Sequence, residues 1–361
     1  MARTLGTGRL SVRIELATAA DDAALRRLAR ELPMAGRIRL AFECEPSFFA
    51  AAEAESDRHH TVIARDEETG EALGMGSRLV RESYVDGEPV PLGYLGQLRL
   101  APAHRGHVLP LLRAGFEVLG ATHCSPEAPF DITSIVADNR PARRLLEAGL
   151  EGLPRYRPVE SLVTFLIPTR RLRAHVDAVD ARGGSAAMAP EILDCLERFS
   201  RRHQFAPRWT AAKMPAADLF HVALAGGRVV GCLARWDQRA FKQVMVRGYD
   251  PALRFWRPLL NLFGAALPRV GEPIAFAHLA PLAVDDDEPA VLVALLRAAL
   301  AAARDAGLEF LSVGLATRHP LVDVVRRACP GREYASTLYA VEWGDPAAFD
   351  GRIAHPEVAL L

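Results

Sequence analysis

The stretch His104–Leu112, HRGHVLPLL, has the residue types of an anion-binding loop. It is predicted to follow an apolar strand and to open a helix, whose N-terminal N–H groups and dipole favour a bound anion. Val108 and Pro110 stand where such a loop usually has glycine; Val108 adds a Cβ, and Pro110 has no N–H. The stretch is therefore either an anion site that lacks one donor, which costs about 1.5–3 kcal/mol, or a loop whose proline simply begins a helix.

Lysine is nearly absent from the chain, since of 44 basic residues only Lys213 and Lys242 are lysine. An ammonium is a compact point charge and is not equivalent to a guanidinium. Lys242 follows a segment in which strand alternation places Asp237 and Arg239 on one face. We predict Lys242 and Asp237 as residues near the substrate; the alternative is an ordinary ion pair at a strand edge.

The elements that must position these residues follow one order twice. In the first half, a strand pair with a turn at Gly70 is followed by a strand ending at Leu100, the helix after His107, a strand, a short helix after Asn139 and a closing strand. The second half repeats this order, with a turn at Gly226 and a long helix after Pro289. Strands that alternate with helices indicate an α/β fold, and the repeat indicates a duplication divided near residue 171.

Composition excludes several classes of protein. A chain of 361 residues favours two domains, and a formal net charge of zero gives no basic field for nucleic acid. No apolar run approaches the roughly 20 residues of a membrane helix, and the N-terminal residues lack an apolar signal core, so we expect no membrane association. The cysteines are scattered without metal-type spacing, which predicts reduced thiols, a cytoplasmic location and no metal.

Two motifs in the first half resemble those of the GNAT superfamily of acyl-CoA-dependent N-acyltransferases. LRLAPAHRGHVLPLL is similar to the family's strand and pyrophosphate loop, and VADNRPARRLLEAGL to its Asn-x-x-Ala-x-x-Leu helix. The motifs stand about thirty residues apart, and the resemblance covers residues 11–168. It implies two tandem GNAT-like domains, each a mixed twisted sheet flanked by helices: an acyl-CoA-binding domain at 1–170 and a degenerate domain without a CoA site at 171–361.

The resemblance also implies which residues hold the donor. The strand before the loop separates from its neighbour in the family, and its backbone pairs with the pantetheine arm; that role falls to Leu98, Arg99 and Leu100. The backbone of the loop and helix start binds the pyrophosphate, and Asn139 binds near the pantetheine. The implied loop residues are Arg105, Gly106, His107, Val108 and Leu109.

The chain departs from the family at the groups that transfer protons. The helix that often carries a general-acid tyrosine has Leu145-Leu146-Glu147 here, and Tyr94 stands where some members have a glutamate base. Tyr94 and Tyr156 are the replacement catalytic candidates, with packed aromatics near strand ends as the alternative. Aminolysis of a thioester can also depend mainly on positioning, so these departures do not exclude activity.

The second half differs at the equivalent loop. Asp285 to Glu288 stand at the start of its long helix, where acids suit the helix dipole but repel a pyrophosphate, and His319 replaces the asparagine of the second motif. We therefore predict no CoA site in this half. Trp236, Phe255 and Trp256 are predicted to pack between the halves.

The leading hypothesis is an N-acyltransferase that moves an acyl group from acetyl-CoA or another acyl-CoA to an amine of a small molecule or peptide. The alternative is a catalytically inactive GNAT-like protein that binds a small molecule. A third hypothesis, transfer from an aminoacyl-tRNA, is disfavoured by the neutral charge and the absence of a basic stripe. The oligomeric state is left open.

Overall fold

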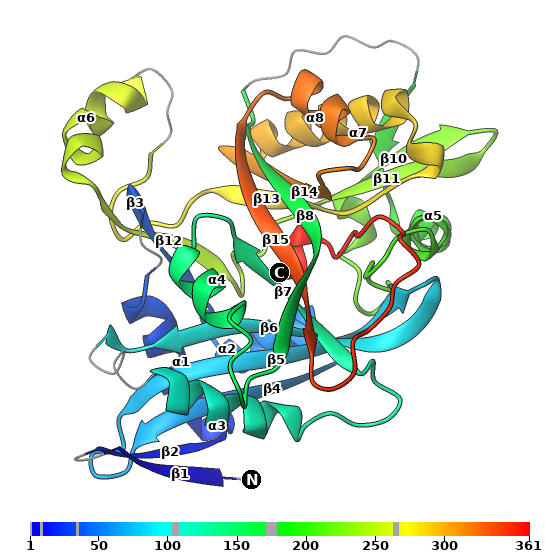
Figure 1. Cartoon of the computed structure of the whole chain (residues 1–361). Coiled ribbons are helices and arrows are strands. Elements are labelled where there is room, and N and C mark those ends of the chain that lie inside the picture. The colour runs from blue at the N-terminus through cyan, green and yellow to red at the C-terminus, as the bar shows by residue number, and fades with distance from the viewer. Residues whose placement is uncertain (1, 8–9, 34–35, 103–107, 171–178, 263–266) are drawn as a thin grey trace.

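The computed structural model describes residues 2–7, 10–33, 36–102, 108–170, 179–262 and 267–361 (Figure 1). Its first half contains, in chain order, β1 (Ala2–Thr7), β2 (Leu10–Leu16), α1 (Asp22–Glu31), β3 (Ile38–Glu43), α2 (Phe48–Glu55), β4 (Arg58–Asp66), β5 (Ala72–Val85), β6 (Glu88–Leu100), α3 (Val108–Gly120), β7 (Phe130–Val136), α4 (Arg140–Leu146) and β8 (Arg155–Pro168).

The second half repeats this order with additions. It contains β9 (Ala181–Gly183), α5 (Ala189–Arg201), β10 (Phe220–Ala225), β11 (Arg228–Trp236), β12 (Gln243–Tyr249), α6 (Pro251–Leu262), β13 (Phe276–Val284), the short 3-10 helix η5 (Asp285–Asp287), α7 (Pro289–Asp305), β14 (Phe310–Ala316), α8 (Val322–Ala328), β15 (Arg332–Glu342) and a second 3-10 helix, η6 (Val358–Leu360). The sequence did not predict α6 or β12.

Local signals fix the predicted elements. The side chain of Ser47 accepts a hydrogen bond from Ala50 N and caps α2, and that of Asn139 caps α4, with Pro141 in the first turn. Gly226 and Gly227 have positive φ at the turn between β10 and β11, a conformation that glycine adopts without strain.

Thirteen strands of the described chain form one continuous sheet rather than two separate ones. Their order is β1-β2-β4-β5-β6-β7-β15-β8-β14-β13-β11-β10-β9. The closing strand of each half has crossed over: β15 lies between β7 and β8 and is antiparallel to both, and β8 pairs with β14. Each half therefore completes the sheet of the other.

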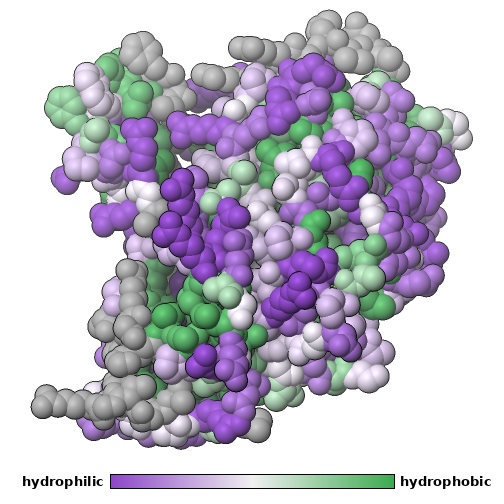
Figure 2. All heavy atoms as spheres, in the orientation of Figure 1, coloured by the Kyte–Doolittle hydropathy of each residue, from purple (hydrophilic) through white to green (hydrophobic). Residues whose placement is uncertain are grey.

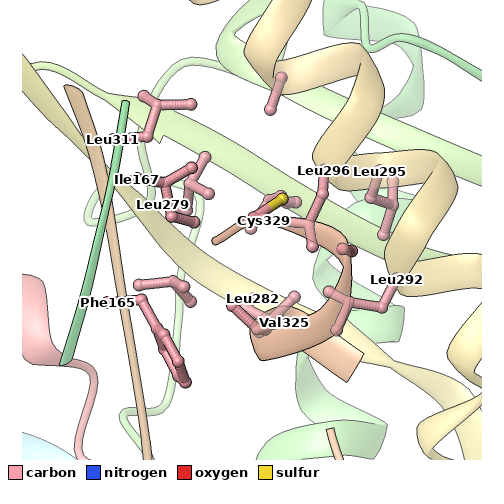
Figure 3. Packing of buried hydrophobic residues seen from close by; sticks show 14 of the residues in the cluster. Phe165, Ile167, Leu279, Leu282, Leu292, Leu295, Leu296, Leu311, Val325 and Cys329 are labelled. Atoms are coloured by element: carbon pink, nitrogen blue, oxygen red, sulfur yellow. The ribbon is translucent and has the colours of Figure 1, made fainter. Parts of the chain in front are cut away.

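The core of the second half includes side chains from the first. Phe165 and Ile167 of β8 pack in one buried cluster with residues of β13, β14, α7 and α8 (Figure 3). On the other side of the molecule, α3 packs on β2, β4 and β5, and Tyr339 of β15 belongs to the same cluster as the α3 residues.

The predicted aromatic contact between the halves is wrong for all three of its residues. Phe255 and Trp256 lie on α6, which projects from the sheet at the upper left of Figure 1, and they are 74% and 52% exposed. Trp236 is buried, but against Ala280 and Leu360. The halves are joined instead by the crossed strands and by a two-stranded sheet of β3 and β12. No helix of the described residues has the length and apolar character to span a bilayer.

Candidate active site

The first feature of the site is a fork between the parallel strands β6 and β7. They pair only at Gly93 with Asp131 and at Tyr94 with Ile132, and Thr133 Oγ1 then donates to the carbonyl of Leu95 at 2.7 Å. No further pairing joins β6 to β7 within the residues that the structure describes. The later backbone groups of β6 on this side are consequently available to an extended ligand, as at an open sheet edge.

A bulge in β6 produces the fork. On β5, Ser77 pairs with Gly96 and Met75 with Arg99, so that two residues of β6, Gln97 and Leu98, oppose one residue of β5. Gln97 has a φ of 54°, which is uncommon for a residue other than glycine. A bulge bends its strand and breaks the alternation of its side chains. Strand alternation is therefore interrupted at Gln97.

The open end of the fork, where β6 and β7 are no longer paired, is apolar. Leu98 is 46% exposed at the end of β6, and Val136 is exposed at the end of β7. Figure 2 shows hydrophobic residues gathered in a recess below the hydrophilic α4, near the end of β6. The two other predicted donor-binding residues of this strand, Arg99 and Leu100, are half-buried and still pair with β5.

The predicted pyrophosphate loop is only partly described. Arg105, Gly106 and His107 lie outside the described residues, so their roles stay predictions. Val108 and Leu109 are the first residues of α3, and Pro110 follows in its first turn. The N–H groups of a first turn have no partner within their helix, so proline at this position costs the helix nothing and removes only a donor to an outside ligand. Asn139 is exposed at the N-terminus of α4.

The two tyrosine candidates lie on opposite faces of the sheet. Tyr94 is the last paired residue of the fork, and it packs with a cluster that includes Phe205. Tyr156 is buried on the other face against Phe116 of α3, with ring centroids 6.3 Å apart. The structure therefore brings only Tyr94 to the vertex of the fork, while Tyr156 lines an open cavity of about 390 Å³ formed by the segment after α4 and the start of β8.

Tyr94 is a protonated phenol at neutral pH. Burial raises its pKa to about 12, although hydrogen bonds from the amide of Ser134 and the hydroxyl of Thr133 act in the opposite direction. A cavity of about 10 Å³, room for roughly one water, adjoins the side chain; its wall includes Arg81, Phe205 and Leu361. The phenol can therefore donate a hydrogen bond or a proton, but it does not act as a base near pH 7.

The two lysines both bind the C-terminal end of α2. Lys242 Nζ lies 2.7 Å from Glu55 Oε1, and both side chains are largely buried. Lys213 Nζ donates to the carbonyls of Glu53 and Ser56, where a cation also suits the helix dipole. The sequence singled out Lys242 correctly as unusual, but its partner is Glu55 of the first half.

Asp237 does not pair with Lys242. Its carboxylate accepts hydrogen bonds from the backbone and the guanidinium of Arg239, the closest being 2.6 Å from Nη2. The side chain of Arg239 holds the pKa of Asp237 below its usual value, against the effect of burial. Asp237 is therefore part of a local turn.

Arg81 is a residue of this site that sequence reasoning missed. It lies on β5 opposite Leu92, and its Nη2 atom is buried without a hydrogen-bond partner among the described residues. Burial lowers its pKa to about 10, and the charges of Glu55 and Asp57 partly offset this effect. An arginine between the apolar Val80 and the buried end of the strand gave no distinct signal, because Arg78 and Glu82 stand close to it in the same strand.

A buried ion network supports the vertex of the fork from the α3 side. Arg78 Nε lies 2.9 Å from Asp131 Oδ1, and both side chains are fully buried. Arg78 Nη2 also lies 2.6 Å from Glu127, and Trp343 Nε1 of the second half donates to Asp131 at 2.9 Å. Gly93 leaves room for this contact, because a Cβ there would lie 1.9 Å from Asp131 Oδ1. The ion network thereby fixes the position of Asp131, which pairs with Gly93 at the start of the fork.

The second half has a comparable fork that is filled by the chain itself. β13 and β14 pair only from Phe276 to His278, and the C-terminal η6 contacts both strands beyond that point. The amide of Leu282 donates to Glu357 Oε1 at 2.9 Å, and Val358 occupies the space where a Cβ on Gly314 would lie. The backbone that is available in the first fork is therefore covered in the second.

Comparisons with known proteins support the fold class that the sequence predicts. At the level of sequence, no family model and no curated protein matches the chain. Among solved structures, Saccharomyces cerevisiae N-myristoyltransferase with bound myristoyl-CoA is similar over 97% of this chain and 89% of its own, at 13% identity and a TM-score of 0.58.

Two bacterial structures are similar over a comparable length. A GCN5-related N-acetyltransferase from Sphaerobacter thermophilus matches 94% of this chain and 98% of its own, at 16% identity and a TM-score of 0.56. A probable N-acyltransferase from Enterococcus faecalis matches 91% of this chain and 72% of its own, at 10% identity and a TM-score of 0.52. The chain thus has a tandem GNAT-like α/β fold.

Proposed function

We propose that the chain is an acyl-CoA-dependent N-acyltransferase that acts on an amine of a small molecule or peptide. The observation that carries this proposal is the fork, which leaves the backbone of β6 after Leu95 available to an extended ligand. A pantetheine arm contains amide groups and can pair with such a backbone as a strand would. The shared fold with N-acyltransferase structures supports the same conclusion.

The donor site is proposed to lie in the first half, residues 1–170. The backbone of Leu98, Arg99 and Leu100 would hold the pantetheine arm, with Asn139 nearby. The start of α3 would hold the pyrophosphate through the backbone of Val108 and Leu109, together with the preceding loop, Arg105, Gly106 and His107. Acetyl-CoA is the first donor to test, beside longer acyl-CoAs.

The second half, residues 171–361, is proposed to bind no CoA. Its fork is filled by η6, and three aspartates form η5 at the position of the pyrophosphate loop. We propose that it shapes the acceptor side, where the ion pair of Lys242 with Glu55 and that of Asp237 with Arg239 would position the surrounding backbone. The cytoplasm is the proposed location, supported by cysteines that are all free in the structure.

The chemistry requires an amine nitrogen to attack the thioester carbonyl carbon, after which the C–S bond breaks, the nitrogen releases one proton to solvent, and CoA leaves as a thiolate that takes one proton. Tyr94 is proposed as the donor to that sulfur, because it lies at the vertex of the fork and remains protonated at neutral pH. The fork itself would contribute by holding the thioester in place. We assign Tyr156 a packing role.

Titration calorimetry with the purified chain tests the donor site. We expect one acetyl-CoA or longer acyl-CoA to bind per chain, and Pro110→Ala to bind it more tightly by up to about 1.5–3 kcal/mol, because alanine supplies an N–H to the pyrophosphate. The gain should persist for CoA and vanish for an acyl-pantetheine, which lacks the pyrophosphate. Two sites per chain, or no binding of any acyl-CoA, would contradict the proposal. An equal gain with CoA and with the acyl-pantetheine would mean that residue 110 does not contact the pyrophosphate.

Tyr94→Phe tests the chemical step, with Tyr156→Phe as its matched control. Loss of a positioned proton donor reduces rate by about 10²–10⁴-fold. We therefore expect Tyr94→Phe to lower kcat by about 100-fold with little change in the KM for acyl-CoA, and Tyr156→Phe to leave kcat nearly unchanged. The measurement is steady-state thiol release with an accepted amine. Equal effects of the two variants would show that Tyr94 has no special role.

A further inference from the structure

A cluster of three histidines and one aspartate lies in the second half, away from the fork of the first. His203 follows α5, His319 follows β14, His355 precedes η6, and Asp287 ends η5. The ring centroids of the histidines are 5.3 to 6.3 Å apart. One ligand atom from each of His203, Asp287 and His319 lies within 4.8 Å of the other two. Residues distant in sequence thus bring metal-ligating atoms together.

The histidines are buried and incompletely hydrogen-bonded. His203 Nδ1 lies 2.8 Å from the carbonyl of Phe199 and donates to it, which leaves the lone pair on Nε2. His319 is 2% exposed, and its Nε2 has no hydrogen-bond partner among the described residues. A buried polar atom without a partner is costly, and its presence calls for an explanation such as an ion. Burial lowers the pKa of both residues to about 3, so both rings are neutral.

Asp287 is turned toward these rings by an unusual backbone. Asp286 and Asp287 have φ values of 53° and 52°, and two successive left-handed residues other than glycine are costly. The Asp287 carboxylate is largely buried, and Arg202 Nη2 contacts it at 3.5 Å, while Nε2 of the neutral His319 ring lies 3.9 Å away. The loop therefore presents beside two imidazoles a carboxylate whose ion pair with Arg202 is long.

We propose that His203, His319 and Asp287 bind one divalent transition-metal ion of the zinc class, with His355 beside it as a further ligand. Bonds of about 2.0–2.1 Å place two ligand atoms of a tetrahedral zinc about 3.3 Å apart. The ligand atoms here lie within 4.8 Å of one another, so the distances between them must shorten by roughly 1.5 Å or less. Two imidazoles and one carboxylate favour Zn²⁺ or Co²⁺ over Mg²⁺ and Ca²⁺, which prefer oxygen. Metal on His319 Nε2 moves the ring proton to Nδ1, so the 3.2 Å contact from Leu321 N to Nδ1 opens.

The place of the site in the fold gives it a structural role. η5 occupies the position between β13 and α7 that the predicted pyrophosphate loop occupies between β6 and α3 in the first half. The metal would tie this loop to the end of α5 and to the turn between β14 and α8. His355 belongs to the segment that leads into η6, so the same ion would secure the chain that fills the second fork. A cation would thus stand where the first half is proposed to hold an anion.

Metal binding to the tag-free full chain tests the proposal without any assay of activity. After chelator treatment and dialysis, we expect one equivalent of Zn²⁺ or Co²⁺ per chain by elemental analysis, a visible Co²⁺ spectrum of low coordination number, and a melting temperature raised by Zn²⁺ but not by Mg²⁺. A stripped wild-type chain that takes up neither ion would overturn the proposal.

Two near-isosteric variants locate the site. Asp287→Asn and His319→Gln are expected to weaken Co²⁺ binding at least tenfold and to remove the zinc-dependent rise in melting temperature. His221→Gln on β10 is the control, because His221 is a half-buried histidine of the same half outside the cluster, and it should bind as wild type does. Wild-type affinity in both Asp287→Asn and His319→Gln would overturn the assignment. If either variant is unfolded, His203→Gln replaces it with the same expected loss.

Discussion

Replacing Asp131 with alanine is expected to destabilise the folded chain by about 3–5 kcal/mol, because it leaves the buried Arg78 guanidinium with only one of its two charge partners, Glu127. Both side chains are fully buried, so water cannot replace the lost carboxylate without opening the sheet. Trp343 and His123 also lose their contact with Asp131, and this loss reaches the second half of the chain. The measurement is the free energy of unfolding in urea.

Glu333→Ala is the matched control for this variant. It removes the ion pair with Arg326, which is exposed on the surface, so screening by water leaves the free energy of unfolding close to the wild-type value. Asp131→Asn, which keeps the size of the side chain, should fall between Asp131→Ala and wild type. An Asp131→Ala chain that unfolds at the wild-type urea midpoint would mean that the buried pair does not hold the vertex of the fork.

Truncation after Thr169 is expected to abolish cooperative folding of the first half. The truncated chain lacks β15, which pairs with both β7 and β8, and β14, the other partner of β8. Phe165 and Ile167 would lose the core in which they are buried. We expect no sigmoidal thermal transition and strong binding of a dye that reports exposed apolar surface.

A truncated chain with β15 added back shows whether the first half needs only the crossed strand or the whole second half in order to fold. Joining residues 332–342 to residue 169 through a flexible linker restores the strand between β7 and β8, and we expect it to recover part of the cooperative transition. A strand of the same length with Leu338 and Tyr339 changed to serine is the control. A truncated chain that already melts as a compact unit would contradict the role of the crossed strands.

The sequence by itself determined most of the elements and their order, because the signals for them are local, though it did not predict β12 and α6. The hydroxyl of Ser47 caps the helix that directly follows it, and Gly226 and Gly227 allow the turn between their two strands. The repeated order of elements, which indicated a duplicated α/β fold, is likewise a property of neighbouring residues. The scarcity of lysine marked Lys242 as unusual, but it could not name Glu55, which lies 187 residues away.

Only the tertiary structure decided which strands are neighbours and which distant side chains meet. Alternation tells which residues of β8 face a core, but Phe165 and Ile167 would show the same pattern against either half. The bulge at Gln97 depends on its pairing with β5, and the cluster of His203, Asp287 and His319 has no motif spacing. Such contacts are fixed by the packing of the whole chain, because the apolar pattern that drives folding specifies burial without specifying the partner.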